Sequence, residues 1–252
     1  MLKFFRRIRR KLIDEGNLKR YLIYAIGEVF LVMIGILLAL QVNKWNEAVQ
    51  TRKLETKYLQ RLQKDLIQDT IYFSRRIDAS KKIKSDHYSF IQKMYEEQKD
   101  KQAFTDLLSL INWNSDNLTV QNSTFTEMIS SGKLDIISNE SLKENIILLY
   151  KRYEEISADI SGINETSKYH YRKIMSKHYK YRPGFNRMWG KETFFDNREW
   201  QCINQPFSED FRLTETTVAY YLGKHGKFVK YFNELEEMTK SLIEQIQKEV
   251  TK

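Results

Sequence analysis

Cysteine, proline and glycine are scarce in this chain of 252 residues. It has one cysteine (Cys202), two prolines and nine glycines. A single cysteine excludes an intramolecular disulfide, so a disulfide framework does not stabilise this fold. Few prolines and glycines, with 30% charged residues, favour long helices over turn-rich β structure. The length suits one sizeable domain together with an anchor.

Motifs of the common catalytic and metal sites are also absent from the sequence. The four histidines form no His-x-x-x-His pair, and there is no Gly-x-Ser-x-Gly elbow. Ser131-Gly132-Lys133 lacks the other residues of a phosphate-binding loop and is typical of a helix C-terminus. We therefore expect no enzyme activity, no metal site and no cofactor.

One long apolar run is present, from Tyr21 to Val42, with Glu28 as its one ionisable residue. As a helix, this run covers the roughly 30 Å hydrocarbon core of a bilayer. It is longer than the apolar core of a signal peptide, and no small-x-small cleavage site follows it. The sequence therefore predicts an uncleaved transmembrane helix over residues 21–43, with the lipid bilayer as its first partner.

The positive charge is concentrated before this run. Residues 1–20 carry eight Lys/Arg and two acids, which is +6 of the formal net charge of +9. The positive-inside rule places the amino terminus in the cytoplasm and residues 44–252 on the far side. Phe5, Ile8 and Leu12 share a helical face, which predicts an amphipathic arm on the inner leaflet; an unstructured basic tail is the alternative. Because little net charge remains beyond the arm, nucleic acid is not an expected partner.

Glu28 is the residue of the run that needs an explanation. An unpaired carboxylate in hydrocarbon costs a few kcal/mol or more, so it is expected to be neutral, to reach the interface or to face a polar partner. Gly35 and Ala39 form a small-xxx-small pair beside it, which allows a second helix to approach closely. A partner membrane protein or a second copy of the chain is one interpretation. A carboxyl group bonded locally to Tyr24 and merely tolerated is the other.

Apolar spacing predicts an all-α domain after the membrane segment. A first helix is expected to continue from Lys44 to about Met94, with one interruption near Asp78. A short helix over 104–111 and a polar loop over 112–122 follow. Three long helices with short ones between them predict an antiparallel bundle.

Local signals predict where the later helices begin and end. Thr124 and Glu127 have the spacing of a capping box, and Gly132 is expected to end that helix. Ser138-Asn139 is expected to cap a long helix that continues toward Tyr179. Ser208 is expected to open a segment that kinks at Gly223 and Gly226 before the last helix. Its apolar face comprises Phe228, Phe232, Leu235, Met238, Leu242, Ile246 and Val250.

Residues 168–191 contain eight Lys/Arg and no acid, interleaved with tyrosines, Phe185 and Trp189. Cationic and aromatic side chains together bind anionic glycans or acidic protein surfaces. The alternative is that the tyrosines pack the end of the bundle and the cations are only solvated. The candidate binding residues are Arg172, Lys173, Lys177, Lys180, Arg182 and Arg187.

Two blocks of the sequence resemble a known family. The arm and span, from Phe4-Phe-Arg-Arg to Lys44-Trp45-Asn-Glu, and the stretch Ser123-Thr-Phe-Thr-Glu-Met-Ile-Ser-Ser-Gly-Lys-Leu134 are similar to those of an uncharacterised family of single-pass proteins from flavobacteria and related Gram-negative bacteria. The resemblance implies a bacterial inner-membrane protein with a periplasmic domain. It implies no activity, because the family is a domain of unknown function.

Three hypotheses for function follow. The first is a membrane-anchored helical interaction or scaffold protein, an accessory subunit of an inner-membrane assembly. The second is an ion-driven subunit that uses Glu28; its layout is similar to that of proton-driven stator and energiser subunits, whose periplasmic domains are not visible here. The third is a periplasmic ligand sensor, which is disfavoured because about twenty cytoplasmic residues leave no room for an output domain.

Overall fold

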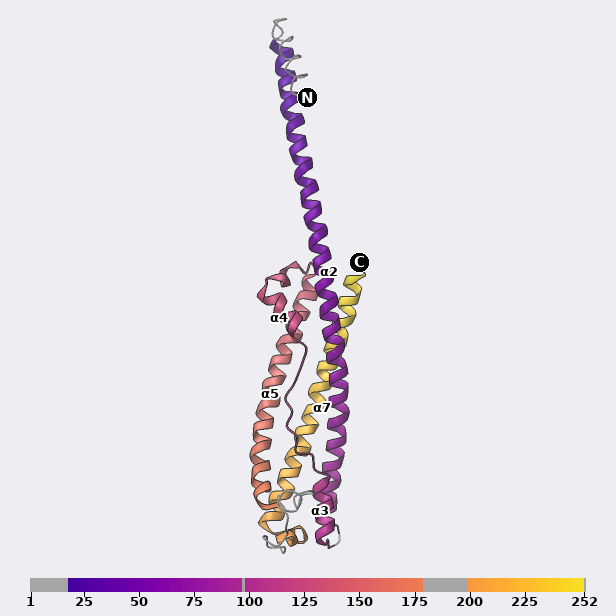
Figure 1. The fold of residues 1–252 in the computed structure, drawn as a ribbon, viewed down its shortest axis with the longest axis vertical. Helices are drawn as coiled ribbons and strands as arrows, with labels where there is room; N and C mark the ends of the chain where they lie inside the picture. Colours follow the sequence, from indigo (N-terminus) through magenta and orange to yellow (C-terminus); the bar gives the residue numbers. More distant parts are fainter. Residues whose placement is uncertain (1–17, 97, 179–198, 252) are drawn as a thin grey trace, which may run out of the picture. The chain divides into compact units, whose positions relative to one another are not determined.

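A computed structural model describes residues 18–96, 98–178 and 199–251, and this part of the chain is all-helical with no strand. Three helices are long: α2 (Leu18–Met94), α5 (Glu140–His178) and α7 (Glu209–Val250). The short elements are α3 (Lys101–Ser109), α4 (Ser123–Ser130) and the 3₁₀ helices η1 (Lys133–Ile136) and η4 (Glu199–Asn204). Figure 1 shows their order along the chain.

The chain divides into two compact units, the first ending at Lys57 and the second beginning at Tyr58. The apolar part of α2 belongs to the first unit. Within the described residues, α2 is the one helix long and apolar enough to cross a membrane, and nothing in the chain buries its most apolar stretch. The predicted continuation of the span past Lys44 as helix is confirmed. The predicted amphipathic arm, with Phe5, Ile8 and Leu12, lies outside the described residues.

The expected interruption of the first helix near Asp78 is wrong, because α2 is continuous to Met94. Asp78 is exposed, while Ile77 and Ser80 beside it remain buried. The buried face thus continues through this point with helical spacing, and a polar residue on the solvent face does not break a helix.

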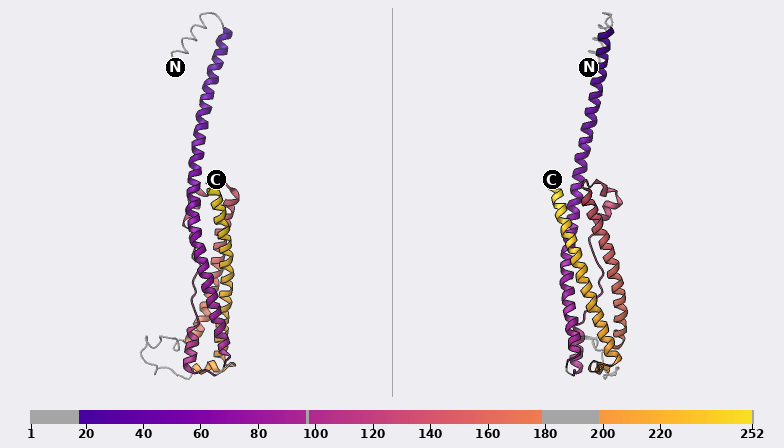
Figure 2. Two further views of the ribbon diagram at one scale, coloured as in Figure 1. Left: turned by 90° about the vertical axis from the view of Figure 1, so that its right-hand side faces the viewer. Right: turned by 180° about the vertical axis from the view of Figure 1, so that it is seen from behind.

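In the second unit, α5 and α7 pair along most of their lengths (Figure 2). Asn145 donates to Gln245, Arg152 contacts Glu234 through two hydrogen bonds of 2.6 and 3.1 Å, and Tyr221 donates to the Ser167 carbonyl. Residue numbers therefore fall along α7 as they rise along α5. Gln63 of α2 donates to Gln247 of α7 at 2.8 Å, so the last turns of the chain also contact α2.

The core of this unit is aromatic at its centre. Phe73 of α2 packs against Tyr153 of α5 and Phe232 of α7, with ring centroids 5.7 and 6.3 Å apart. All three are at most 2% exposed. Nearer α3, a second cluster of buried side chains joins α2, α3, η4 and α7, namely Phe90, Met94, Phe104, Leu107, Leu108, Ile111, Ile203, Phe211 and Val218. Burial of large rings from all three long helices is what fixes their packing.

Two helix boundaries follow the sequence and one does not. Ser208 Oγ accepts from the Phe211 N–H and Asn139 Oδ1 from the Leu142 N–H, as their N-cap positions predict. The capping box at Thr124 is wrong: α4 begins at Ser123, Thr124 is buried, and no side chain caps the helix. Its expected partner Glu127 is instead bonded to two side chains of α2.

The glycines of the later helices behave differently from one another. Gly132 ends the α4 turn with φ of 64°, the left-handed conformation that favours glycine after a helix. The segment expected to kink at Gly223 and Gly226 and the last helix are not separate elements, since α7 is one helix from Glu209 to Val250. Each internal glycine costs a helix about 1 kcal/mol, and the continuous buried face on either side of the pair outweighs that cost.

Candidate functional site

Residues 112–122, between α3 and α4, run as an extended segment, called here the strap (Figure 1). An extended segment has no helical or sheet partners for its backbone N–H and C=O groups, so it needs other partners where it is buried. In this protein, side chains of all three long helices provide them.

The first set of contacts comes from α2. The Asn112 N–H donates to His87 Nε2 at 3.3 Å, and Arg76 forms a 2.9 Å ion pair with Asp116. The Tyr72 hydroxyl donates to the Asn117 carbonyl at 3.4 Å and accepts from the Thr119 N–H at 3.3 Å. Further along, the Gln121 N–H donates to Asp69 Oδ1 at 2.8 Å. These side chains, spaced along α2, follow the strap over most of its length.

Two side chains of α5 hold the strap from the other side. The Tyr150 hydroxyl donates to the Gln121 carbonyl at 3.2 Å. The amide of Asn164, which is 1% exposed, donates to the Asp116 carbonyl at 3.1 Å and to Asn117 Oδ1 at 2.9 Å. Between these two points no hydrogen bond joins the strap to α5 within the described residues.

The contact from α7 is a buried lysine. Lys224, 3% exposed, donates through Nζ to the Asn114 carbonyl at 3.1 Å and to Ser115 Oγ at 3.0 Å. Its ammonium also lies 4.8 Å from the ring centroid of Tyr221 and 5.5 Å from that of Phe228. Carbonyl, hydroxyl and aromatic faces replace the water that the ammonium loses on burial.

The groups around the strap have shifted pKa values. Burial lowers the pKa of Lys224 to about 8, although Asp116 opposes the shift. Burial also lowers the pKa of His87 to about 4 and that of His225 to about 3, with Lys224 adding to both shifts. Burial raises the pKa of Asp69 to about 6, against the Gln121 hydrogen bond. The two imidazoles are therefore neutral at pH 7. The hydrogen bonds between these groups and the strap depend on the exclusion of water from around them.

These two histidines do not form a metal centre with other ligands. Their ring centroids are 6.0 Å apart, and His225 is 3% exposed with neither ring nitrogen hydrogen-bonded in the described chain. Among the described residues, no group of three or more His, Cys, Asp or Glu side chains is placed to hold a metal ion.

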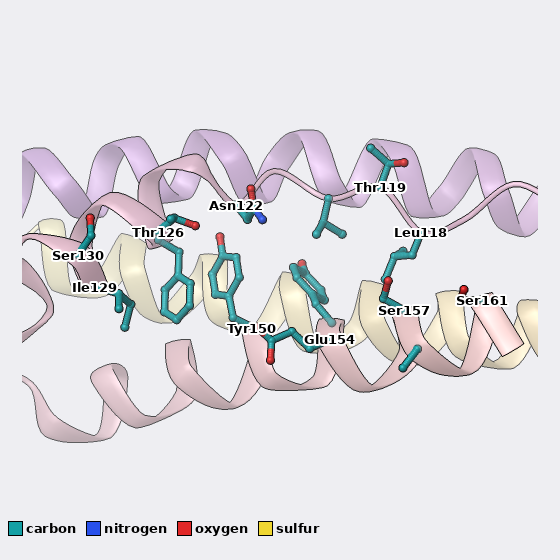
Figure 3. Close-up of a pocket in the computed structure, with 14 residues that line it drawn as sticks. Leu118, Thr119, Asn122, Thr126, Ile129, Ser130, Tyr150, Glu154, Ser157 and Ser161 are labelled. Atoms are coloured by element: carbon teal, nitrogen blue, oxygen red, sulfur yellow. The ribbon is translucent and has the colours of Figure 1, made fainter.

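A groove lies where the strap and α4 stand apart from α5 (Figure 3). Its volume is about 810 Å³. On one wall Phe125 stacks on Tyr150, with ring centroids 3.9 Å apart and planes within 2°. Ile129, on α4, is 52% exposed in it. The lining residues are Leu118, Thr119, Val120, Asn122, Phe125, Thr126, Ile129, Ser130, Tyr150, Tyr153, Glu154, Ser157, Ala158 and Ser161.

The groove contains one charged side chain and no cation. Glu154 is exposed and forms no ion pair or hydrogen bond with the other described residues. Other acids nearby are paired: Glu155 and Glu234 with Arg152. Apolar walls, hydroxyl groups and one carboxylate suit a partner with an apolar surface and a positive charge, and the site shows no nucleophile–base pair for catalysis.

The predicted membrane residues all lie on α2 in the first unit. Glu28 is half-buried and has an interaction of its own within the chain. Gly35 and Ala39 are exposed, and a Cβ added at Gly35 would meet nothing within 4 Å. No described part of the unit covers this face.

The predicted basic site is described only in part. Arg172 and Lys173 are exposed near the end of α5, and Lys173 lies 4.6 Å over the Tyr169 ring. Lys177 is in α5, while Lys180, Arg182 and Arg187 lie outside the described residues. Nearby Tyr171 packs on Trp113 of the strap, with centroids 5.3 Å apart, as the packing alternative for these tyrosines predicts.

The described residues form a helical protein with one candidate membrane span and an open groove beside the strap. Residues 28–157 match a protein-family model described as a family of unknown function, DUF6090. The match spans more than half of the chain, which belongs to this family. It includes twelve of the fourteen groove-lining residues, all but Ala158 and Ser161. No curated protein and no solved structure matches the chain.

Proposed function

We propose that this protein is a membrane-anchored interaction protein, an accessory subunit of a bacterial inner-membrane assembly, which binds a partner protein in the strap groove. The observation that carries the proposal is the groove itself. Its apolar wall stays open because the strap is bonded to side chains of three different helices, and between the Asn164 and Tyr150 contacts no hydrogen bond joins it to α5 within the described residues. Ordering a segment in this way is costly in entropy, and an apolar surface kept exposed is typical of a protein-binding site.

The membrane placement is part of the proposal. Eight Lys/Arg precede the apolar run of α2, which supports an amino terminus in the cytoplasm. The three long helices would then form an antiparallel bundle in the periplasm, held near the membrane by the first part of α2. The exposed face with Gly35 and Ala39 offers a second contact, to a membrane helix of the same partner or of another copy.

Photo-crosslinking in the native membrane tests the proposal. We would place p-benzoylphenylalanine at Ile129, inside the groove, and at Leu148 of α5 as the matched control. The two side chains are 52% and 55% exposed, and Leu148 does not line the groove. A single adduct is expected from Ile129 and none from Leu148. The adduct should disappear with Ala158→Arg, which fills the groove with a long charged side chain.

Two results would contradict this function. One is the absence of any adduct from Ile129 in cells that express the protein at its native level. The other is an adduct that forms equally from Leu148 or that survives Ala158→Arg. Either result would mean that the groove is an unoccupied surface.

The second candidate function, an ion-motive-force-coupled subunit, is favoured by a different observation. Glu28 is a half-buried carboxylic acid within the apolar part of α2. Carboxyl groups at such depth in membrane helices commonly carry protons or ions. This function predicts that Glu28 must titrate, which substitutions at that position can separate from a role in assembly.

A further inference from the structure

Nearer α3, the backbone groups of Asn112, Asn114 and Asp116 are bonded to the long helices. Over residues 117–121, the strap has one hydrogen-bonded edge and one edge that is open within the described residues. In an extended segment, the backbone groups of alternate residues point to opposite edges. Asn117, Thr119 and Gln121 direct their bonded backbone groups to Tyr72 and Asp69 of α2 or to Tyr150. Leu118 and Val120 alternate with these residues, so their N–H and C=O groups point to the opposite edge, and these groups make no hydrogen bond within the described residues.

The open edge borders the groove. The side chains of Leu118 and Val120 line it, as Figure 3 shows for Leu118. Both residues are only partly buried. Four main-chain donors and acceptors at a spacing of two residues, beside an apolar wall, form the template to which an extended chain adds as a strand.

We propose that the groove binds an extended peptide segment of the partner protein, which pairs as a β-strand with Leu118 and Val120 of the strap. Alternate side chains of the peptide pack on Phe125 and Ile129. A lysine or arginine of the peptide pairs with Glu154, the one charged residue of the groove. This inference rests on the proposed function and specifies the chemistry of the partner.

A strand fits these observations better than the two other occupants that an apolar groove suggests. A helix has its own backbone hydrogen bonds satisfied internally, so it would leave the Leu118 and Val120 groups unpaired beneath it. An anionic glycan would meet the Glu154 carboxylate and no lysine or arginine among the lining residues. The strap is also held rigidly on its other edge, which reduces the entropy lost when a strand pairs with it.

Hydrogen exchange and peptide binding test the inference on the full chain in detergent. The probe is a dodecapeptide selected from a random phage-displayed library, with counter-selection on Ala158→Arg. Its binding should slow exchange of the Leu118 and Val120 amides about tenfold or more, because these amides gain acceptors. The Thr119 and Gln121 amides, already bonded to α2, should change little.

N-methylation of the peptide gives the sharper result. Methyl groups on every second peptide amide, in the register that faces the strap, should weaken binding about tenfold. The same number of methyl groups on the intervening amides, which face away from the strap, should weaken binding far less. Glu154→Gln should weaken binding of a lysine-containing peptide and leave its lysine-to-glutamine analogue unchanged. Glu155→Gln, next along α5, is the matched control.

The inference is wrong if no groove-dependent peptide is selected, if N-methylation in the two registers has equal effects, or if Leu118 and Val120 gain no protection. These results leave the photo-crosslink at Ile129 unaffected, so a partner that docks as a helix would still satisfy the proposed function. Loss of the Ile129 crosslink itself would contradict the function and the strand together.

Discussion

Lys224 of α7 donates to the main-chain carbonyl of Asn114 at 3.1 Å, across 110 residues of sequence. Lys224 is 3% exposed, and its Nζ also donates to Ser115 Oγ at 3.0 Å. A buried cation that contacts neutral oxygens is kept charged only against the cost of desolvation. This contact therefore makes the attachment of the strap sensitive to pH.

The first prediction concerns stability at alkaline pH. The folded-state pKa of Lys224 is about 8, below the 10.5 of the unfolded chain, so between these values the unfolded state binds more protons. The free energy of unfolding should rise with pH there, by about 2 kcal/mol between pH 7.5 and 9.5. Lys224→Met should abolish this rise, measured by urea denaturation of the full chain in detergent.

Lys168→Met is the matched control for that measurement, because it removes the same charge from a side chain that is 46% exposed. It should retain the rise seen in the parent protein. A rise that persists in Lys224→Met would mean that this lysine is hydrated in solution and does not hold the strap as a buried cation.

The second prediction concerns stability at acid pH, and it has the same sign: the free energy of unfolding again rises with pH. His225 has a folded-state pKa of about 3, below its unfolded value of 6.5, so protonation favours the unfolded chain. Its contribution to stability is complete above pH 6.5 and is lost as the pH falls toward 3. Between pH 7 and pH 5 the loss should be about 2 kcal/mol, and His225→Leu should remove this part of the acid sensitivity.

Asp69 acts against the histidines in the same range. Its pKa is raised to about 6, so its contribution is present below pH 3.8 and is lost as the pH rises through 6. The free energies of unfolding of His225→Leu and of the parent protein are therefore compared at each pH. The contribution of Asp69 is present in both proteins and cancels in the difference. Equal slopes for the two proteins from pH 7 to 5 would show that His225 is accessible to water.

The parts of the fold that the sequence predicts are those with a local cause. Leu142, Ile146, Leu149, Tyr153 and Ile156 of α5 are all buried, and helical spacing alone brings these side chains together on one face. The caps at Asn139 and Ser208 are likewise local, since each side chain bonds an N–H three residues ahead.

The strap could not be predicted in the same way. Its partners lie 25 to 110 residues away, and no spacing along the chain reports them. One signal was present: Asp69 interrupts an apolar stripe between Leu66 and Phe73, and a carboxylate on a buried face needs a donor from elsewhere. Lys224 and His225 lie between Gly223 and Gly226. Because these glycines were interpreted as a kink, the sequence did not predict that one buried face continues through them. Glu127 fitted a local cap but instead binds Arg61 at 2.6 Å.

The third prediction concerns topology. If the amino terminus is in the cytoplasm, alkaline phosphatase fused to the carboxyl end should be active, because that enzyme folds only where disulfides form. A green fluorescent protein fused at the same point through the same export route should be dark. An inactive phosphatase together with a fluorescent reporter would reverse the orientation and remove the periplasm from the proposed function.

The last prediction separates the two functions at Glu28. In an assembly role the side chain contributes a hydrogen bond in the membrane, so Glu28→Gln should keep the affinity-tagged protein together with its partner in mild detergent. Glu28→Leu should reduce the amount of co-purified partner, although the span itself would insert more readily.

In an ion-coupled role Glu28→Gln should leave the complex intact and fail to complement a deletion strain, because an amide cannot exchange protons near neutral pH. Glu28→Asp should restore part of that function. The matched control is Gln41→Leu, a polar-to-apolar change near the other end of the span, which should alter neither measurement. If Glu28→Gln and Glu28→Leu both assemble and complement normally, the carboxyl group is only tolerated in the membrane, and neither function can depend on it.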